Sequence, residues 1–372
     1  MKDPTSHATA MVIGASGQDG YFLTERLLSD HWMVHAIVRR PESLIELRES
    51  EQGKKLLEVH VVELSDPRRL FDLIARERCT EIYNLSGQSS VSRSFREPLL
   101  SWLINADFVA SLLECVRCKS PDSRFYQASS TDMFGTSPEG FEVYNENSAL
   151  NPQSPYASAK AAAHLLCHSY REFYGLRIAS GILSNHESHR RPETFISRKV
   201  VEHVLNLMNC SPGELAQSPP LMMGNLKVER DWGFAPDYVE GMCRILRQIE
   251  VRAAQTGKVE ADVAANYRDY VLATGKTHAV WELVDCAFTI GGFELDWEIE
   301  GKDVAAWRAH FRSSGKPAVM VDPNLVRTAE PLTIQVDPAR ARVELGWAPR
   351  QGLDSFLKEM FEKLPRASLA TL

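Results

Sequence analysis

The sequence predicts an α/β fold, a doubly wound parallel sheet followed by a smaller C-terminal lobe. Between residues 10 and 183, short apolar runs rich in β-branched residues alternate with segments of helical periodicity. Strands that alternate with helices of this length are typical of parallel sheets with right-handed crossovers. Beyond residue 183 the pattern becomes irregular, with proline and glycine at 211–213 and 218–220. We therefore expect one large sheet domain and a second, less regular part.

The expected elements follow from these patterns. In the first half, the strands are expected at 10–13, 34–38, 59–62, 81–85, 124–128 and 176–183. The helices between them are expected at 23–29, from Pro67 onward, and at 99–118 and 155–174. In the second half, helices are expected at 239–253, 280–288 and 352–364, and a polar surface excursion at 254–268. We assign 1–183, with returning segments at about 231–277, to the sheet domain, and 184–230 with 278–372 to the lobe.

Composition and charge narrow the class of protein. The chain has 372 residues, of which 44% are hydrophobic and 24% charged, as is usual for a globular protein. A net charge of −7 argues against a nucleic-acid partner, although a few local arginines suffice for anionic small ligands. No stretch approaches the ~20 apolar residues needed to span a bilayer, so no membrane partner is expected. The polar residues 1–9 lack the pattern of a signal peptide, and we expect a cytoplasmic protein.

The cysteines give no sign of a metal site. Of the seven, Cys115 and Cys118 alone have a CxxC-like spacing, and no second pair or nearby histidines accompany them. We expect reduced structural thiols and no bound metal.

A glycine-rich segment follows the first expected strand and opens the first expected helix. It runs from Gly14 through Ser16, Gly17, Gln18 and Asp19 to Gly20. The first glycine permits a tight turn, the second lets the backbone approach a pyrophosphate, and the third lets helix pack on sheet. The helix N-terminus adds N–H groups and a positive dipole. The segment therefore indicates a Rossmann-type dinucleotide site, with a purely structural turn as the alternative.

The second expected strand ends at Arg39 and Arg40. An acidic residue there would accept a hydrogen bond from the ribose 2′-hydroxyl of NAD and repel a 2′-phosphate. Arginine does the opposite, so NADP is the expected cofactor. The alternative is a basic turn that is merely solvated.

A tyrosine and a lysine lie four residues apart on the helix expected at 155–174. Tyr156 and Lys160 therefore share one helix face. An ammonium and a cationic cofactor ring beside a phenol stabilise the phenolate, which then serves as a base toward a substrate hydroxyl. This motif comes after the fifth strand of a dinucleotide fold, which favours catalysis.

Polar side chains follow the fifth expected strand, where open α/β sheets place their active sites. Ser130 and Thr131 carry hydroxyls that can bond a sugar, and the carboxylate of Asp132 can move protons. The alternative is that these residues only cap a turn.

Taken together, these residues resemble the GDP-mannose 4,6-dehydratase family, which belongs to the extended short-chain dehydrogenase/reductase superfamily. The resemblance spans nearly the whole chain. Its most specific part is the stretch 154–160 with 181–195, which includes the signature NHESHRRPETF. Further matching stretches are 17–20, 39–40, 224–226, 230–233, 237–239, 273–275, 321–323 with Arg327 and Glu330, and 345–347.

The resemblance implies an internal redox cycle on a GDP-sugar. Tyr156, assisted by Lys160, would take the proton of the C4 hydroxyl while hydride leaves C4 for NADP⁺. The resulting 4-keto group acidifies the C5 hydrogen, and a carboxylate removes it as the C6 hydroxyl departs as water. Hydride then returns to C6 and a proton to C5. From GDP-mannose the product would be GDP-4-keto-6-deoxymannose.

The resemblance also assigns roles to single residues. Ser130 stands at the position of the family's catalytic threonine, and Asp132 at that of the glutamate that acts as C5 base. This carboxylate is one methylene shorter, and a misplacement of about 1 Å can cost roughly 100-fold in rate. The further cofactor contacts that the resemblance implies are Glu63, Leu64, Leu85, Gln88, Ser89, His186 and Arg191. The implied contacts to the GDP-sugar are Ser130, Asn185, Thr194, Lys199, Arg230, Arg327 and Glu330.

Other readings stay open. The same dehydration on another GDP-sugar, such as a GDP-manno-heptose, needs only local changes of the pocket. A 4-epimerase or reductase would use Tyr156 and Lys160 without elimination, and it would need no base at position 132. A nucleotide-sugar-binding or NADP-binding regulatory protein would not need Tyr156 and Lys160 intact. Family members assemble as homodimers or homotetramers, so a second copy is an expected partner. Residues 209–220 and 253–268 look like loop insertions.

Overall fold

The computed structural model describes residues 7–136, 143–299, 301, 303–326 and 331–365. The chain folds into two compact units. The first comprises Met1–Ser184, Ala235–Ala273 and Val336–Ala348, and the second comprises Asn185–Phe234, Thr274–Gln335 and Pro349–Leu372.

The first unit is built on a seven-stranded sheet in which all neighbouring strands pair in parallel. The strands are β1 (Thr9–Ile13), β2 (Met33–Val38), β3 (Leu57–Val61), β4 (Glu81–Asn84), β5 (Arg124–Ser130), β7 (Ile178–Leu183) and β11 (Tyr270–Leu272). Their order is β11-β7-β5-β4-β1-β2-β3. The order reverses between β1 and β4, which is where such sheets bind ligands. The predicted doubly wound sheet is therefore confirmed, with β11 returning from the second half of the chain.

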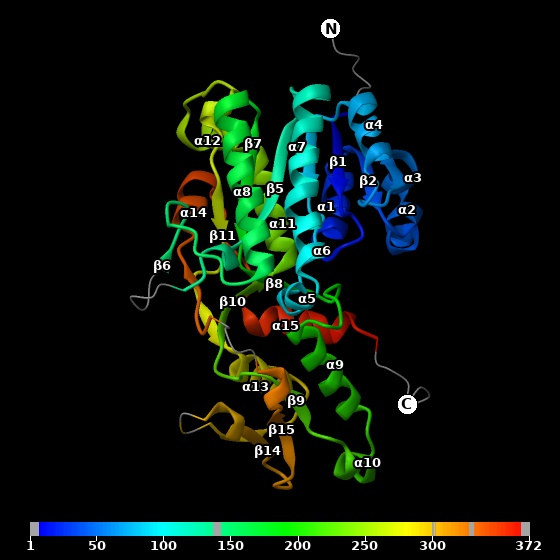
Figure 1. Cartoon of the computed structure of the whole chain (residues 1–372). Coiled ribbons are helices and arrows are strands. Elements are labelled where there is room, and N and C mark those ends of the chain that lie inside the picture. Colours follow the sequence, from blue (N-terminus) through cyan, green and yellow to red (C-terminus); the bar gives the residue numbers. More distant parts are fainter. Residues whose placement is uncertain (1–6, 137–142, 300, 302, 327–330, 366–372) are drawn as a thin grey trace. The chain divides into compact units, whose positions relative to one another are not determined.

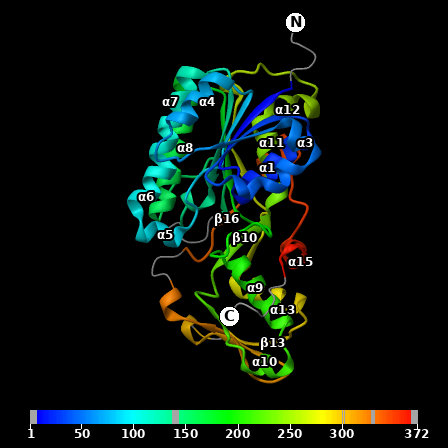
Figure 2. The ribbon, with the colours of Figure 1, turned by 90° about the vertical axis from the view of Figure 1, so that its right-hand side faces the viewer.

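Helices cover both faces of this sheet, as Figure 2 shows. One face packs against α1 (Gln18–Ser29) and α11 (Ala235–Leu246), which join a core of buried apolar side chains. The other face packs against α4 (Arg68–Glu77), α7 (Phe108–Lys119) and α8 (Pro155–Tyr174). Because both faces are buried, inner strands such as β1 and β7 are mostly apolar runs, whereas the edge strand β3 carries the polar residues Glu58 and His60. Short helices α2 (Ile45–Glu49) and α3 (Glu51–Leu56), between β2 and β3, were not predicted.

The helix predicted at 99–118 is assembled from three pieces. It begins with α6 (Pro98–Trp102), continues through a π-helical turn (Leu103–Asp107) and ends as α7. By length and composition, Pro98–Lys119 is the one helix in the described part of the chain able to cross a membrane. This corrects the expectation that no stretch approaches such a length and apolarity. Leu112 and Val116 are fully buried in the core of the first unit, which accounts for much of its apolar character.

The second unit contains two smaller sheets around its own core. One consists of β8 (Asn185–Glu187), β10 (Glu229–Phe234) and β12 (Thr277–Ala279). The other consists of β9 (Leu221–Met223), β13 (Leu295–Glu298), β14 (Arg308–Phe311) and β15 (Pro317–Val321). Its helices are α9 (Ile196–Met208), α10 (Pro212–Gln217), α13 (Val280–Ile290) and α15 (Leu353–Lys363) (Figure 1). The sequence predicted α13 and α15 but none of these short strands.

Two segments differ from the predicted domain boundaries. Residues 336–348, expected in the C-terminal lobe, belong to the first unit. The reason is that α14 (Ala339–Leu345) packs against α12 (Gln248–Thr256), and the buried Trp347 donates from Nε1 to the carbonyl of Asp237 at 2.8 Å. The returning segment itself runs from 235 to 273 rather than from about 231 to 277. The excursion predicted at 254–268 holds the end of α12 and a short 3₁₀ turn (Ala264–Asn266).

Candidate active site

The glycine segment forms the turn between β1 and α1. Gly14 has φ +88°, a conformation that side chains disfavour, and a Cβ on it would lie 3.0 Å from the carbonyl oxygen of Leu85. A Cβ on Gly20 would lie 2.3 Å from the carbonyl oxygen of Gly14. Gly17 is the N-cap of α1 and, as a glycine, supplies no side-chain cap of its own. A helix that begins in a glycine turn of this kind directs the positive end of its dipole toward the turn, where an anion is favoured.

Replacing Gly14 by alanine tests this account of the turn. Both the left-handed backbone and the contact with Leu85 and Ser86 oppose a Cβ, so we expect the free energy of unfolding to fall by about 1–3 kcal/mol. Urea denaturation measures the change. Gly213→Ala is the control, because nothing lies within 4 Å of a Cβ there and α10 accommodates alanine, so that variant is expected to be at least as stable as the wild type. Equal stability of Gly14→Ala and the wild type would contradict the account.

The other predicted cofactor residues of the first unit lie in loops after its strands. Leu85, Gln88 and Ser89 follow β4, and a Cβ on Gly87 of the same loop would lie 3.7 Å from Lys160 Nζ. Gln88 is buried, and its Oε1 has no hydrogen-bond partner in the described part of the chain. The structure thus brings together the loops after β1 and β4 and the side chain of Lys160.

The residues that directly follow β2 and β3 lie at the same end of the sheet, the end where the parallel strands finish. Arg39 and Arg40 directly follow β2 and are exposed, and no ion pair to either is found among the described residues. Glu63 is exposed and Leu64 half-buried just beyond β3. Because the carboxyl ends of parallel strands lie at one end of the sheet, these side chains lie at the same end as the glycine turn.

Tyr156 and Lys160 lie in the first two turns of α8. Ser154 is the N-cap of this helix, and its side chain accepts from the N–H of Ala157 at 3.1 Å. Both side chains are buried, and Lys160 Nζ lies 6.0 Å from the centroid of the Tyr156 ring. Lys160 Nζ donates to the carbonyl oxygen of Ala128 on β5 at 2.9 Å. The burial lowers the pKa of Lys160 to about 8, and the carboxylate of Asp19 opposes this shift.

Ser130 and Asp132 lie where β5 ends. Ser130 is the last residue of β5, and its Oγ accepts from the N–H of Asp132 at 3.2 Å. Asp132 is half-buried in a 3₁₀ turn (Thr131–Met133) that packs against α8, the helix of Tyr156. Ser130 therefore caps the turn by accepting this hydrogen bond. A serine hydroxyl can accept and donate at once, so its O–H remains able to donate. The structure places a carboxylate and a hydroxyl beside the helix that carries Tyr156 and Lys160.

The remaining described site residues belong to the second unit. Asn185 and His186 lie on β8, which pairs with β10, and His186 is buried. Arg191 forms an ion pair with Glu187 at 3.1 Å and stacks on the Phe195 ring at 3.8 Å.

Among the residues predicted to contact the nucleotide sugar, Thr194 and Lys199 are exposed, whereas Asn185 and Arg230 are half-buried. Lys199 on α9 donates to the carbonyl oxygen of Met222 at 2.6 Å. Arg230 on β10 donates to the carbonyl oxygen of Pro331 at 2.9 Å. Arg327 and Glu330 lie outside the described residues.

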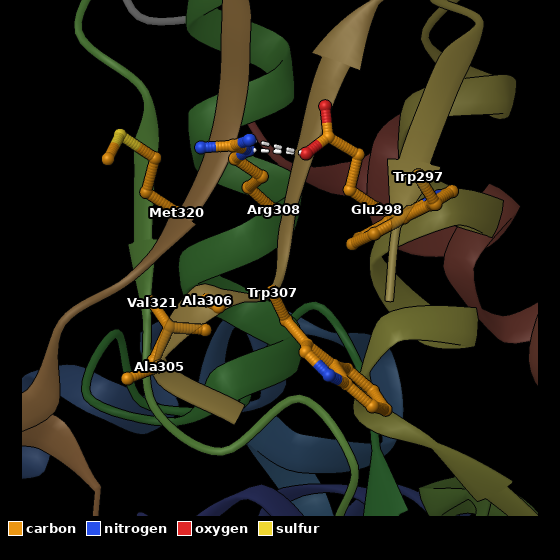
Figure 3. Close-up of a pocket in the computed structure, with 8 residues that line it drawn as sticks. All are labelled: Trp297, Glu298, Ala305, Ala306, Trp307, Arg308, Met320 and Val321. Carbon is orange, nitrogen blue, oxygen red and sulfur yellow. Dashed lines mark hydrogen bonds and ion pairs between the residues drawn. The ribbon is translucent and has the colours of Figure 1, made fainter. Parts of the chain in front are cut away.

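A pocket of about 550 Å³ in the second unit lies elsewhere, beside β13, β14 and β15. Figure 3 shows the rings of Trp297 and Trp307 at its wall and the ion pair between Arg308 and Glu298. No residue predicted for the site lines this pocket.

One residue of the first unit could not be recognised from the sequence. Asn105 lies in the π-helical turn, buried, where its Oδ1 accepts from the N–H of Gln88 at 3.2 Å and its Nδ2 donates to the Gln88 carbonyl at 3.1 Å. It therefore fixes the loop after β4. π-Helical turns are frequent at functional sites. The available signal was a polar amide within an otherwise apolar helical run.

Comparison with known proteins identifies the family. The family model described as GDP-mannose 4,6 dehydratase matches residues 11–360. GDP-mannose 4,6 dehydratase 2 of Arabidopsis thaliana is 34% identical over 368 residues, covering 95% of this chain and 86% of the relative. The GDP-mannose 4,6-dehydratases of Sinorhizobium fredii and Vibrio cholerae are also 34% identical, covering 96% and 94% of this chain and 96% and 92% of the relatives.

Solved structures support the fold. The UDP-glucose 4-epimerase of Thermotoga maritima superposes with a TM-score of 0.71 at 18% identity, covering 95% of this chain and 97% of its own. The dTDP-glucose 4,6-dehydratase of Streptomyces venezuelae gives the same TM-score at 18% identity, covering 95% and 96%. At such identities the likeness concerns the fold alone. The match of the family model and the identity to full-length relatives show that the chain belongs to the GDP-mannose 4,6-dehydratase family.

Proposed function

We propose that the chain is a cytosolic, NADP-dependent hydro-lyase that converts GDP-mannose to GDP-4-keto-6-deoxymannose. The observation that carries this proposal is the joint placement of Tyr156, Lys160 and Asp132. All three belong to the end of β5 and the helix packed against it, in a chain of the GDP-mannose 4,6-dehydratase family. An epimerase or reductase has no use for the carboxylate.

The residues of the first unit fit a nicotinamide dinucleotide. Gly14 and Gly20 keep the turn after β1 free of side chains, and the start of α1 presents backbone N–H groups to a pyrophosphate. The buried Oε1 of Gln88 is an acceptor for a ligand donor. Bound NADP⁺ would supply a hydride acceptor for carbon 4 and, once reduced, a hydride donor for carbon 6.

Tyr156 is the proposed base for the hydroxyl on carbon 4. With a pKa lowered to about 8, Lys160 is still mostly protonated at pH 7, and its ammonium stabilises the phenolate form of Tyr156. The bond from Lys160 to the Ala128 carbonyl keeps that charge at the end of β5. Tyr156 would accept the hydroxyl proton as the 4-keto group forms.

Asp132 and Ser130 are proposed to carry the elimination. The 4-keto group acidifies the C5–H bond, so the Asp132 carboxylate can remove that proton as the C6 hydroxyl leaves. The proton and the hydroxide together make the water that is lost. Ser130 would hold the sugar by donating its hydroxyl proton to the oxygen on carbon 4. The proton held by Tyr156 replaces the one removed from carbon 5.

The second unit is proposed to bind the nucleotide part of the substrate. Lys199 and Arg230 lie on α9 and β10 and supply positive charge for a diphosphate, and Asn185 and Thr194 supply hydrogen bonds. Arg191 and His186 of the same unit are proposed cofactor contacts, as are Glu63, Leu64, Leu85 and Ser89 of the first.

Product analysis tests the proposed function. Purified protein incubated with GDP-mannose and NADP⁺ is expected to give a product lighter by one water, detected by mass spectrometry. A parallel incubation with a GDP-manno-heptose distinguishes the alternative substrate. Unchanged GDP-mannose together with turnover of the heptose would reject GDP-mannose as substrate but keep the reaction. No loss of water from either sugar would reject the reaction.

Replacing Arg39 by alanine tests the preference for NADP. Its exposed guanidinium is proposed to pair with the 2′-phosphate, and a hydrogen bond to a charged group contributes about 1.5–3 kcal/mol. The variant is therefore expected to bind NADP⁺ about ten- to hundredfold more weakly, with NAD⁺ affinity unchanged. Isothermal calorimetry measures both. Arg48→Ala on α2, also exposed, is the control. Equal weakening toward the two cofactors would contradict the assignment.

We also propose that the chain forms a homodimer through an exposed apolar face. The face consists of Phe95, Leu99, Trp102 and Leu103, from α5 (Val91–Arg96), α6 and the π-helical turn. Leu99 is 69% exposed. Clusters of exposed large apolar side chains mark association sites, and a second copy is the partner that the family resemblance predicts.

Leu99→Glu tests this dimer. A charge at the centre of an apolar interface has to be desolvated on association, so the variant is expected to be a monomer. Light scattering coupled to size-exclusion chromatography measures the mass, with Val259→Glu as the control, because Val259 is 90% exposed and remote from this face in sequence. A wild-type protein that runs as a monomer, or a Leu99→Glu variant that stays dimeric, would reject the interface.

A further inference from the structure

The outer edge of the seven-stranded sheet places two histidines and a glutamate side by side. β2 and the edge strand β3 pair with His35 opposite Glu58 and Ile37 opposite His60. Side chains two residues apart on a strand point to the same face, so Glu58 and His60 share one face of the sheet. Directly paired residues also point to the same face, so His35, paired with Glu58, lies on it too. None of them has a role in the proposed reaction.

The three side chains already have the spacing of metal ligands. His35 Nδ1 lies 3.2 Å from His60 Nε2 and 3.5 Å from Glu58 Oε2, and His60 Nε2 lies 3.7 Å from the same carboxylate oxygen. Zinc bonds of about 2.0–2.1 Å in a tetrahedron place neighbouring ligand atoms about 3.3 Å apart. A hydrogen bond between the imidazoles and separate ion pairs to Glu58 account for the three distances one by one, whereas a shared cation accounts for all of them at once.

The surroundings suit imidazole ligands. His35 is 3% exposed and His60 is partly buried, so both rings are held between the strands and their helices. On the other side of the His35 ring, Nε2 lies 3.7 Å from the carboxylate of Glu77, the last residue of α4. A metal-bound histidine usually directs its second ring nitrogen to a carboxylate, which fixes its tautomer. Glu58 is exposed, so a water has access to a fourth position.

We propose that His35, Glu58 and His60 bind a divalent transition-metal ion, Zn²⁺ in the first instance, with water as the fourth ligand. Two imidazoles and one carboxylate suit zinc, whereas Mg²⁺ and Ca²⁺ prefer sites made of oxygen ligands. The ion joins β2 to the edge strand β3 and therefore stabilises the edge of the first unit. No sequence motif marks this site, because 25 residues separate His35 from His60 and only strand pairing brings them together.

The test is a Zn²⁺ titration of the full chain without cofactor, in competition with a chromophoric chelator. The wild type is expected to hold one Zn²⁺ per chain and to melt at a higher temperature when it is bound. Glu58→Gln and His60→Gln are expected to weaken this binding at least tenfold. Glu58 is exposed and His60 only partly buried, so both variants retain the packing of the sheet, unlike a variant of buried His35. The control is His31→Asn, because His31 is an exposed histidine of the same unit.

The outcomes distinguish a specific site at these three residues from nonspecific binding of Zn²⁺ elsewhere on the protein. Loss of the Zn²⁺ in Glu58→Gln and His60→Gln, with full binding by His31→Asn, supports the site. Binding that is the same in the wild type and all three variants would mean that Zn²⁺ sits elsewhere, on other histidines or cysteines, and would overturn the proposal. No binding by the wild type would overturn it outright. Mg²⁺ is expected to leave the melting temperature unchanged.

Discussion

Tyr156→Phe is expected to reduce kcat for GDP-mannose dehydration by about 10²–10⁴-fold, the usual contribution of a positioned general base. The phenol ring lies buried in the first turns of α8, and phenylalanine preserves its apolar contacts. Only the ionisable oxygen is removed. Binding of NADP⁺ and the melting temperature are therefore expected to stay close to those of the wild type. Steady-state kinetics, calorimetry and thermal denaturation measure these three quantities.

Tyr174→Phe is the matched control for this prediction. Tyr174 ends the same helix but is 56% exposed, so loss of its hydroxyl is expected to leave the rate unchanged. A Tyr156→Phe variant with the activity of the wild type would show that another group takes the proton of the C4 hydroxyl. A similar loss in both variants would point to damage to α8 rather than to catalysis.

Asp132→Asn is expected to slow formation of the 4-keto-6-deoxy product by at least about 10²-fold. An amide has nearly the shape of the carboxylate but cannot accept the C5 proton. Asp132 lies in the 3₁₀ turn whose backbone is held by Ser130 Oγ, so the turn itself is expected to persist. Mass spectrometry of the product measures elimination, and calorimetry with NADP⁺ and GDP-mannose measures binding.

Asp122→Asn serves as the control for the loss of one carboxylate, because Asp122 is exposed in the turn before β5. It is expected to dehydrate GDP-mannose at the rate of the wild type. Continued dehydration by Asp132→Asn would refute the role of Asp132 as the C5 base. The shorter reach of aspartate, compared with the glutamate that the family resemblance leads one to expect, would then be immaterial.

The first unit was predictable because its signals are local. β1, β2 and β7 of the large sheet are short, mostly apolar runs, since helices cover both faces, and the helices beside them carry periodic apolar residues. The glycine turn, Tyr156 and Lys160, and Ser130 with Asp132 occur at fixed places relative to these elements. Their sequence context therefore sufficed to place them together at the carboxyl ends of the strands.

The short strands of the second unit, and contacts between residues far apart in the sequence, were not predictable in this way. β8, β9 and β12 have three residues each, too few to show an alternating pattern. Trp347 returns its segment to the first unit through a bond to Asp237, 110 residues earlier in the chain. Asn105 and the pair of His35 and His60 depend on contacts between elements, which no periodicity reveals.

The most direct test of the central claim uses GDP-mannose carrying deuterium on carbon 4, incubated with the protein and unlabelled NADP⁺. The account requires one active site to remove hydride from carbon 4 and return it to carbon 6 of the same sugar. The product is therefore expected to retain the deuterium, now in its C6 methyl group, as shown by mass spectrometry and NMR. A dehydrated product without deuterium in the methyl group, or label that stays on carbon 4, would contradict the internal hydride transfer.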